Sequence, residues 1–441
     1  MSSAAQKTER TPIGHPGTVA AIRAEIRSSG PITFARFMEL ALYHPEFGYY
    51  TRTAEPQELI GQNRTDHNRI GQNPVGQNRI GPNRIGQNRI GPNRIGWSGD
   101  YYTSFDAHPL LALALARQIG QIDAQLGGPD PCTVVEMGPG KGLLAREVLR
   151  ACEADNPSLA IRLRYLLVER SPAMVAAQRE TLAPWLDSPR VSWLNGLADL
   201  QDGAVTGAML SNELVDAFPV HRIRIVEGKP EELYVAYAGG RFVEQTGPLS
   251  TPFLADYLRR LAAMDIRLPD GYTTEINTQA IAWMKEVARV LGRGVAITID
   301  YGHTARDLYG PDRKRGTLLC YSRHKAFDDP YVRVGMQDMT AHVDFTTLAT
   351  AGEEAGLRVT GFTNQTSFLM GLGAEQMLAS LDPESPELHS AIQLLRPDGM
   401  GRTFKILVQH KGIPAPALDG LQFKPFFGSV LTPSQSKAGK S

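Results

Sequence analysis

The chain has 441 residues, of which 42% are hydrophobic and 21% charged, so it can bury one large core or two moderate ones. The 46 Lys and Arg balance 46 Asp and Glu, so no overall positive field favours nucleic acid or an anionic membrane. Three scattered cysteines give neither a disulfide framework nor a zinc spacing, which is typical of free thiols in a reducing compartment. Because no apolar run reaches the ~20 residues of a membrane helix and the N-terminus has no signal-peptide core, we expect a soluble cytoplasmic protein without membrane insertion.

Residues 55–98 form a low-complexity segment in which the units Gln-Asn-Arg-Ile-Gly and Pro-Asn-Arg-Ile-Gly recur. Asn, Gly and Pro oppose helix formation, and isolated isoleucines offer little apolar surface, so we predict a disordered insertion. Its arginines could instead form a weak basic arm, although their sparse spacing favours a solvated, dispensable loop. The insertion separates segments 43–50 and 99–104, which we interpret as originally contiguous in the sequence. We expect the point where they meet to lie beside the active site.

From Cys132 onward, apolar runs alternate with amphipathic helical stretches, the pattern of an α/β fold with a parallel sheet covered by helices. The predicted strands are 133–137, 165–168, 208–211, 295–300 and 404–410. The predicted helices are 109–126, 143–155, 173–181 and 278–291.

The run 133–142 is the most informative part of the chain, because a buried strand ends in a glycine-dense turn that a helix follows at once. Glycine lets a backbone approach a ligand closely, and a helix N-terminus offers free amides with a positive dipole end. Gly138, Gly140 and Gly142 therefore predict a nucleotide-like site, although a plain strand-to-helix connection gives the same pattern. Leu143 stands where the third glycine of a dinucleotide fingerprint would stand, which disfavours NAD.

Two acids accompany this turn at the spacing of one strand-helix-strand unit. Glu136 lies on the strand just before the turn, and Glu169 ends the next predicted strand. We expect Glu136 to hold the methionine end and Glu169 the ribose hydroxyls of a cofactor, which favours S-adenosylmethionine.

A polar cluster with Asn212, Glu213 and Asp216 follows the predicted strand 208–211. Ligands of open parallel sheets bind at the carboxyl ends of strands, so we expect this loop beside the reactive end of the cofactor. Asn212 could orient a nucleophile. Glu213 and Asp216 could hold a cation, most naturally an arginine guanidinium, which forms two parallel hydrogen bonds with a carboxylate. A helix N-cap explains the same residues equally well.

Asp300 and Tyr301 end another buried strand and are expected in the same cleft, although Tyr301 could equally pack on the sheet edge. The polar segments 315–318 and 337–345 are expected to cover the site. His342 and Asp344 in the second segment have no third ligand at a helical or turn interval, so we predict no metal site.

These residues together resemble the MidA-like family of class I methyltransferases over nearly the whole chain outside the insertion and the tail. The run 212–219 is its most specific part. The resemblance implies a Rossmann-like α/β fold with a seven-stranded, mostly parallel sheet and an antiparallel last strand. The implied regions are a helical N-terminus at 1–54, a core at 99–220 and 276–412, a substrate lobe inserted at 221–275, and a flexible tail at 413–441.

The resemblance also assigns the site. Catalytic roles fall to Asn212, Glu213 and Asp216. Cofactor contacts fall to the glycine turn, both acids, the loop and the segment after the insertion: Glu136, Gly138, Pro139, Gly140, Gly142, Glu169, Asn212, Asp100 and Tyr102. Substrate contacts fall to Phe218, Pro219, Tyr301, His342 and Asp344.

Mitochondrial members of this family act as complex I assembly factors that dimethylate an arginine symmetrically. The resemblance therefore implies a protein-arginine methyltransferase that uses S-adenosylmethionine and has a respiratory complex I subunit as its partner. Its implied location is the cytoplasm, or the mitochondrial matrix in a eukaryote. The oligomeric state is left open. Two other functions stay open: an NAD-dependent oxidoreductase, which Leu143 opposes, and a non-catalytic assembly chaperone that retains the cofactor pocket, which the intact acids and glycines oppose.

Overall fold

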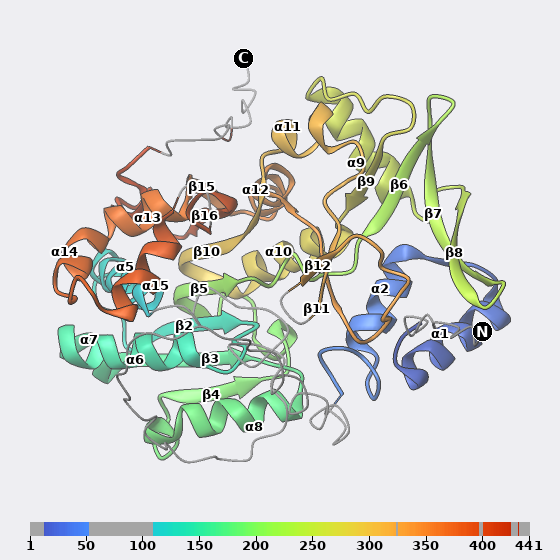
Figure 1. Ribbon diagram of the computed structural model, residues 1–441. Coiled ribbons are helices and arrows are strands. Elements are labelled where there is room, and N and C mark those ends of the chain that lie inside the picture. The colour runs from blue at the N-terminus through green and yellow to red at the C-terminus, as the bar shows by residue number, and fades with distance from the viewer. Residues whose placement is uncertain (1–12, 53–108, 323–324, 397–399, 425–430, 432–441) are drawn as a thin grey trace, which may run out of the picture.

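The computed structural model describes residues 13–52, 109–322, 325–396, 400–424 and 431. The repeat segment 55–98 and the predicted cofactor residues Asp100 and Tyr102 lie outside the described residues. The described part contains a large α/β core and a lobe of antiparallel strands, with a small sheet between them (Figure 1). Within these ranges, no helix combines the length and the apolar character needed to cross a membrane.

The core is built on a sheet whose seven main strands run in the order β15-β16-β10-β5-β2-β3-β4. From β10 to β4 all neighbours pair in parallel, whereas β16, the last strand within the described residues, is antiparallel to both β10 and β15. This order confirms the predicted Rossmann-like sheet, and the two-residue strand β14 (Val343–Asp344) adds to the end of β10. The main strands are β2 (Cys132–Met137), β3 (Leu163–Val168), β4 (Val191–Leu194), β5 (Val205–Asn212), β10 (Leu291–His303), β15 (Arg358–Asn364) and β16 (Phe404–Lys411).

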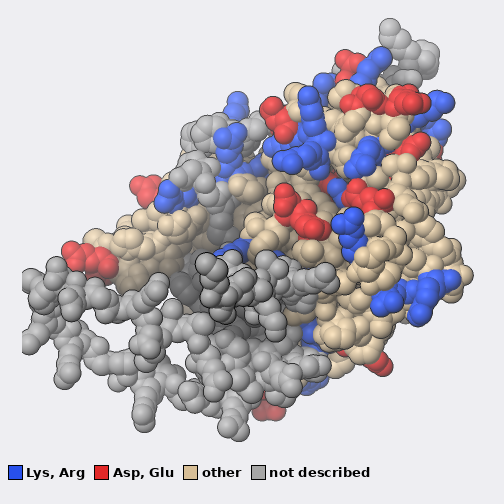
Figure 2. Space-filling model, turned by 45° about the vertical axis from the view of Figure 1, so that its right-hand side comes forward, with Lys and Arg blue, Asp and Glu red and all other residues tan. Residues whose placement is uncertain are grey.

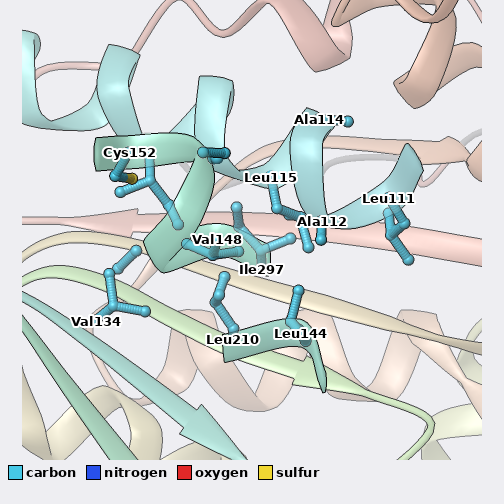
Figure 3. Close-up of a cluster of buried hydrophobic side chains, with 14 of the residues drawn as sticks. Leu111, Ala112, Ala114, Leu115, Val134, Leu144, Val148, Cys152, Leu210 and Ile297 are labelled. Atoms are coloured by element: carbon cyan, nitrogen blue, oxygen red, sulfur yellow. The ribbon is translucent and has the colours of Figure 1, made fainter. Parts of the chain in front are cut away.

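Helices cover both faces of this sheet, which is why its central strands are apolar runs rather than alternating patterns. Val134, Leu210 and Ile297, from β2, β5 and β10, are buried beneath α5 and α6 (Figure 3). The next residue of β2, Val135, points to the opposite face and packs in the cluster of α10 and α12. The core helices are α5 (Leu110–Leu126), α6 (Leu143–Asp155), α7 (Pro157–Arg162), α8 (Pro172–Thr181), α10 (Thr278–Val290), α12 (Phe345–Glu354), α13 (Gln365–Gly371), α14 (Ala374–Ala379), α15 (Pro386–Leu395) and α16 (Met400–Thr403).

All five predicted strands and all four predicted helices are present, with ends shifted by a few residues. β10 is much longer than predicted because β5 and β16 pair with it on both sides. β4 and β15 were not predicted, since most of their residues are only partly buried and carry no continuous apolar run.

The lobe follows β5 and consists of an antiparallel sheet of β6, β7, β8 and β9 together with α9. Phe37 of α2 packs against Phe242 of β8, with ring centroids 5.4 Å apart. The N-terminal region was predicted to be helical, yet it also contains β1, which pairs with β7 because Gly30 ends α1 and the buried Ile32 continues in extended form. The elements are α1 (Pro16–Ser29), β1 (Ile32–Thr33), α2 (Phe34–Tyr43), β6 (His221–Val226), β7 (Lys229–Ala238), β8 (Arg241–Gly247), α9 (Pro252–Ala263) and β9 (Thr273–Ile276).

The small sheet between core and lobe consists of β11 (Leu319–Ser322), β12 (Lys325–Phe327) and β13 (Asp338–Thr340) (Figure 1). It brings the segment before β14 close to the loop after β5, because the amide of Ala341 donates to the carbonyl of Asp216 at 2.9 Å.

The tail was predicted to be flexible from residue 413, and the structure differs in its first part. Leu418 is 4% exposed, and the amides of Asp419 and Gly420 donate to the side chains of Gln121 and Gln118 on α5. These contacts anchor the described residues 413–424 to the core.

Candidate active site

The glycine turn joins β2 to α6 at the carboxyl edge of the core sheet. Gly138, Gly140 and Gly142 have φ angles of 69°, 52° and 77°, which glycine adopts at little cost. A Cβ atom added at Gly138 would lie 2.9 Å from Leu214, whereas one added at Gly140 would have no neighbour within 4 Å among the described residues. Gly142 is the N-cap of α6 and has no side chain to satisfy the first helix amides. The turn is therefore an open cradle of backbone and helix amides, which suits an anionic group such as a carboxylate.

The two predicted acids lie beside this turn, Glu136 on β2 and Glu169 directly after the neighbouring strand β3. Glu136 is 3% exposed and accepts a hydrogen bond from the Tyr165 hydroxyl at 2.7 Å, and burial raises its pKa to about 7. Glu169 accepts from the amide of Ser171 at 2.7 Å and from Gln178 Nε2 at 3.2 Å. Burial raises the pKa of Glu169, and these hydrogen bonds oppose the rise. Two carboxyl groups thus stand beside the cradle, where they can pair with an amino group and with hydroxyls.

The loop after β5 forms turns rather than a helix, so the helix N-cap interpretation of Asn212 and Glu213 is wrong. Glu213 has a φ of 52°, and its amide donates to the carbonyl of Ile299 on β10 at 3.0 Å. Asn212 Nδ2 donates to Glu213 Oε1 at 3.1 Å. A left-handed backbone is uncommon outside glycine and clusters at functional sites, which supports a functional role for this loop.

Asp300, at the end of β10, holds the loop in place. Its Oδ2 atom accepts hydrogen bonds from the amides of Leu214, Val215 and Asp216 at 3.2, 2.8 and 3.3 Å, and its Oδ1 atom accepts from the amide of Tyr301 at 2.8 Å. The side chain is fully buried, and burial raises its pKa to about 7 against the effect of these four bonds. Asp300 therefore contacts the loop itself rather than an open cleft.

Four carboxyl groups gather here, and we call them the acid cluster: Glu213, Asp216, Asp300 and Asp338. Asp216 is 5% exposed, and its pKa is raised well above its usual value by burial and then by the negative charges of Asp300, Glu213 and Asp338. Asp338, the first residue of β13, is 3% exposed and accepts a hydrogen bond from the Tyr50 hydroxyl at 2.6 Å. Sequence analysis did not single out Asp338, although it placed the segment 337–345 over the site.

Tyrosines surround the acid cluster. The hydroxyl of Tyr43 donates to the carbonyl of Ala217 at 2.9 Å, and the rings of Tyr43 and Tyr50 lie 5.4 Å apart. Burial raises the pKa of Tyr301 and of Tyr321, and the charge of Asp216 raises both further. The segment 43–50 thus contacts the loop after β5, while its expected continuation at 99–104 lies outside the described residues.

Tyr301 packs against Phe404 of the inner strand β16, with ring centroids 4.0 Å apart, rather than at the sheet edge. The negative charges of Glu213 and Asp216 contribute to its raised pKa, so it lies near the acid cluster. Phe218 packs edge-on against Trp283 at 6.1 Å, and Pro219 is buried. These two loop residues contribute packing and do not join the acid cluster.

The predicted substrate residues His342 and Asp344 also lie apart from the acid cluster. Asp344 is the N-cap of α12 and accepts hydrogen bonds from the amides of Thr346 and Thr347 and from the Tyr257 hydroxyl. His342 lies beside His303, with ring centroids 5.2 Å apart, and burial lowers its pKa to about 4. Among the described residues, no three His, Cys, Asp or Glu side chains are arranged to bind a metal ion.

The fold and the site together define an S-adenosylmethionine-dependent methyltransferase. The open cradle at Gly140 and the acids Glu136 and Glu169 fit the carboxylate, the amino group and the ribose hydroxyls of this cofactor. The chain belongs to the family described as "Putative S-adenosyl-L-methionine-dependent methyltransferase", whose model matches residues 114–363.

Relatives and solved structures agree with this family. A COG1565 superfamily member from Burkholderia thailandensis, solved with S-adenosyl-homocysteine bound, is 31% identical, with a TM-score of 0.76 over 93% of this chain and 97% of that one. A mitochondrial protein arginine methyltransferase NDUFAF7 homolog from Drosophila melanogaster is 26% identical over 92% of this chain and 87% of its own length. The Homo sapiens NDUFAF7 protein is 22% identical over the same shares. The NAD-dependent oxidoreductase alternative is therefore wrong.

Proposed function

We propose that this methyltransferase transfers methyl groups to an arginine side chain of a protein substrate. The observation that carries the proposal is the acid cluster, with tyrosines such as Tyr50 and Tyr321 near it. Asp216 lies buried among three other carboxyl groups, so ionising it alone is costly, and a cation brought next to it would relieve that cost. A guanidinium is the best-matched cation, because its planar fork of donors pairs with carboxylates and its faces stack on aromatic rings. The names of the curated relatives, protein arginine methyltransferases, support the same substrate.

Each loop residue then has a distinct role in the proposed reaction. Glu213 and Asp216 bind the guanidinium and disperse its positive charge, and Asn212 orients the nitrogen that attacks. S-adenosylmethionine supplies a methyl group that is already activated, so the protein contributes mainly alignment, which in well-oriented systems is worth up to about 7–11 kcal/mol. In the proposed transfer the acceptor nitrogen would form its bond to the methyl carbon as the bond from that carbon to sulfur breaks. S-adenosyl-homocysteine would leave, the nitrogen would release its proton to water, and no covalent intermediate with the protein is needed.

Recognition of the substrate protein would rest on local contacts rather than on a general charge. Basic and acidic side chains are interspersed on the face shown in Figure 2, and the formal net charge is zero. The predicted partner, a respiratory complex I subunit, and the predicted location, the cytoplasm or the mitochondrial matrix, stay predictions. The curated relatives quoted above are named as mitochondrial proteins.

The test is transfer of a labelled methyl group to proteins of a cell extract, followed by mass spectrometry of the labelled site. We expect the label on arginine. We also expect the Asp216→Asn variant to lose this transfer while it still binds S-adenosylmethionine. Two synthetic peptides that carry the identified site, one with arginine and one with lysine in its place, provide the matched comparison.

Two results would contradict the proposal. Label on lysine, or on a small molecule only, would assign a different acceptor to the same fold. Tight cofactor binding without transfer to any protein would instead favour the non-catalytic assembly chaperone.

A further inference from the structure

Gln178 joins two parts of the predicted cofactor site, the glycine turn and Glu169, to strand β4 through one side chain. It lies on α8 and is fully buried. Its Nε2 atom donates to the carbonyl of Gly140 at 2.7 Å and to Glu169 Oε2 at 3.2 Å, while its Oε1 atom accepts from the indole nitrogen of Trp193 at 2.9 Å. A carboxamide nitrogen carries two hydrogens, so both donors of Gln178 are used on cofactor-binding elements.

Trp193, on β4, decides which way this carboxamide faces. An indole N–H can only donate, so the oxygen of Gln178 must face Trp193, and the amino group must then face the glycine turn. The guanidinium of Arg179 lies 4.5 Å from the centroid of the Trp193 ring and covers it. The orientation of the amide is thus set from a strand that carries none of the predicted cofactor residues.

The two donated hydrogen bonds act on parts of the site that would otherwise be adjustable. Gly140 has a left-handed φ, and no atom of the described residues lies within 4 Å of the place where a Cβ would stand, so side-chain packing by these residues does not restrict its backbone. Glu169 accepts from Gln178 Nε2, from the amide of Ser171 and from the backbone of Arg170. A carboxylate has about four acceptor sites, so one is left for a hydroxyl of the ligand.

We propose that Gln178 is a positioning residue for S-adenosylmethionine that couples the conformation of the glycine turn to the orientation of the Glu169 carboxylate. The two ends of the cofactor, one in the cradle and one at the ribose, then meet a single preorganised unit. Preorganisation of this kind strengthens binding because less freedom is lost when the ligand arrives.

The test is calorimetric binding of S-adenosylmethionine and S-adenosyl-homocysteine to Gln178→Met, which keeps the length of the side chain and removes both donors. We expect both Kd values to rise about 10-fold or more, as loss of a hydrogen bond to a charged group implies. Gln365→Met is the matched control. Gln365 is also fully buried and donates to the carbonyl of Leu394 at 2.9 Å, beyond the far edge strand β15. This control should lower the Tm of the ligand-free protein similarly and leave both Kd values within about twofold of the unmodified protein.

A second variant, Trp193→Phe, leaves Gln178 in place and removes only the donor that orients it. We expect the variant to fold and its Kd for the cofactor to rise about threefold, which is the effect of losing one neutral hydrogen bond. Kd values for Gln178→Met within twofold of the unmodified protein, or an equal loss in Gln178→Met and Gln365→Met, would overturn the proposal. If Gln178→Met does not fold, an unchanged Kd in Trp193→Phe overturns it as well.

Discussion

The carboxylate of Asp300 accepts a hydrogen bond from the amide of Val215 at 2.8 Å and so ties the end of β10 to the loop that follows β5. The same oxygen accepts from the amides of Leu214 and Asp216. Because β5 and β10 are adjacent parallel strands, one side chain at their carboxyl ends can fix three consecutive residues of the loop. The position of Asp216 in the acid cluster therefore depends on Asp300.

Asp300→Asn should impair methyl transfer although Asp300 itself is proposed to touch neither substrate nor cofactor. An asparagine has one acceptor atom instead of two, so buried amides of the loop lose a partner, at about 1–3 kcal/mol of the free energy of unfolding. We expect transfer to fall by at least about 10-fold, as a misplaced reacting group implies. Asp123→Asn is the control, because Asp123 is also buried but pairs with Arg162 at the other end of the strands. Equal transfer by the two variants, compared at matched folded fractions, would contradict a role of Asp300 in placing the loop.

Glu213→Ala should lower turnover more than it lowers cofactor affinity. Glu213 is proposed to hold the charged acceptor, and removing one preorganised charge from an active site costs on the order of 100-fold in kcat. Glu227→Ala is a matched control, since Glu227 is an exposed glutamate with nearly the same φ, 51°, in the turn between β6 and β7. Steady-state kinetics and calorimetric Kd values for S-adenosylmethionine separate the two effects. Equal loss of turnover and of cofactor affinity would assign Glu213 to cofactor binding or to structure.

Gly140→Val should abolish measurable cofactor binding. A branched side chain at φ 52° is strained, by roughly 1–3 kcal/mol, and its Cβ would project into the open cradle. Gly239→Val carries the same kind of strain, because Gly239 has φ 59° and open space around it in the β7–β8 turn. Thermal unfolding should show similar destabilisation of both variants, whereas calorimetry should show binding only by Gly239→Val. If Gly140→Val still binds the cofactor, the cofactor site does not lie at this turn.

Glu136 should make the cofactor-free protein less stable as pH rises. Its pKa in the folded chain is raised to about 7 from an ordinary value of 4.5, because burial disfavours the charged form. The contribution of neutral Glu136 to the free energy of unfolding is therefore fully present below pH 4.5 and is lost as pH rises through about 7. The loss amounts to roughly 3 kcal/mol at most. Glu136→Gln stays neutral, so its free energy of unfolding, measured by urea denaturation, should fall less between pH 5 and pH 8. Parallel pH dependences for the two proteins would show that folding does not raise the pKa of Glu136.

The strands that build the core were predictable because their burial on both faces demands continuous apolar runs, as in β2 and β10. The glycine turn was predictable for a related reason, since left-handed backbone at three alternate positions requires glycine. β4 and β15 escaped prediction because they are only partly buried and carry no continuous apolar run, so their place in the sheet depends on backbone pairing with β3 and β16.

The sequence by itself determined the alternation of core strands and helices along the chain, the glycine turn and the place of Glu136 and Glu169 beside it, because each depends on residues close together in the chain. Only the tertiary structure decided the rest of the site. Asp338 lies 122 positions after Asp216 in the sequence, and Tyr50 lies even more positions before Asp216. No local pattern therefore reveals that Asp338 lies near Asp216 and accepts a hydrogen bond from Tyr50. The helix N-cap interpretation of Glu213 failed for the same reason, because the bonds that hold the loop come from Asp300 on another strand. Local propensity sets strands and turns, but the pairing of side chains across strands is set by how the sheet and the lobe pack together.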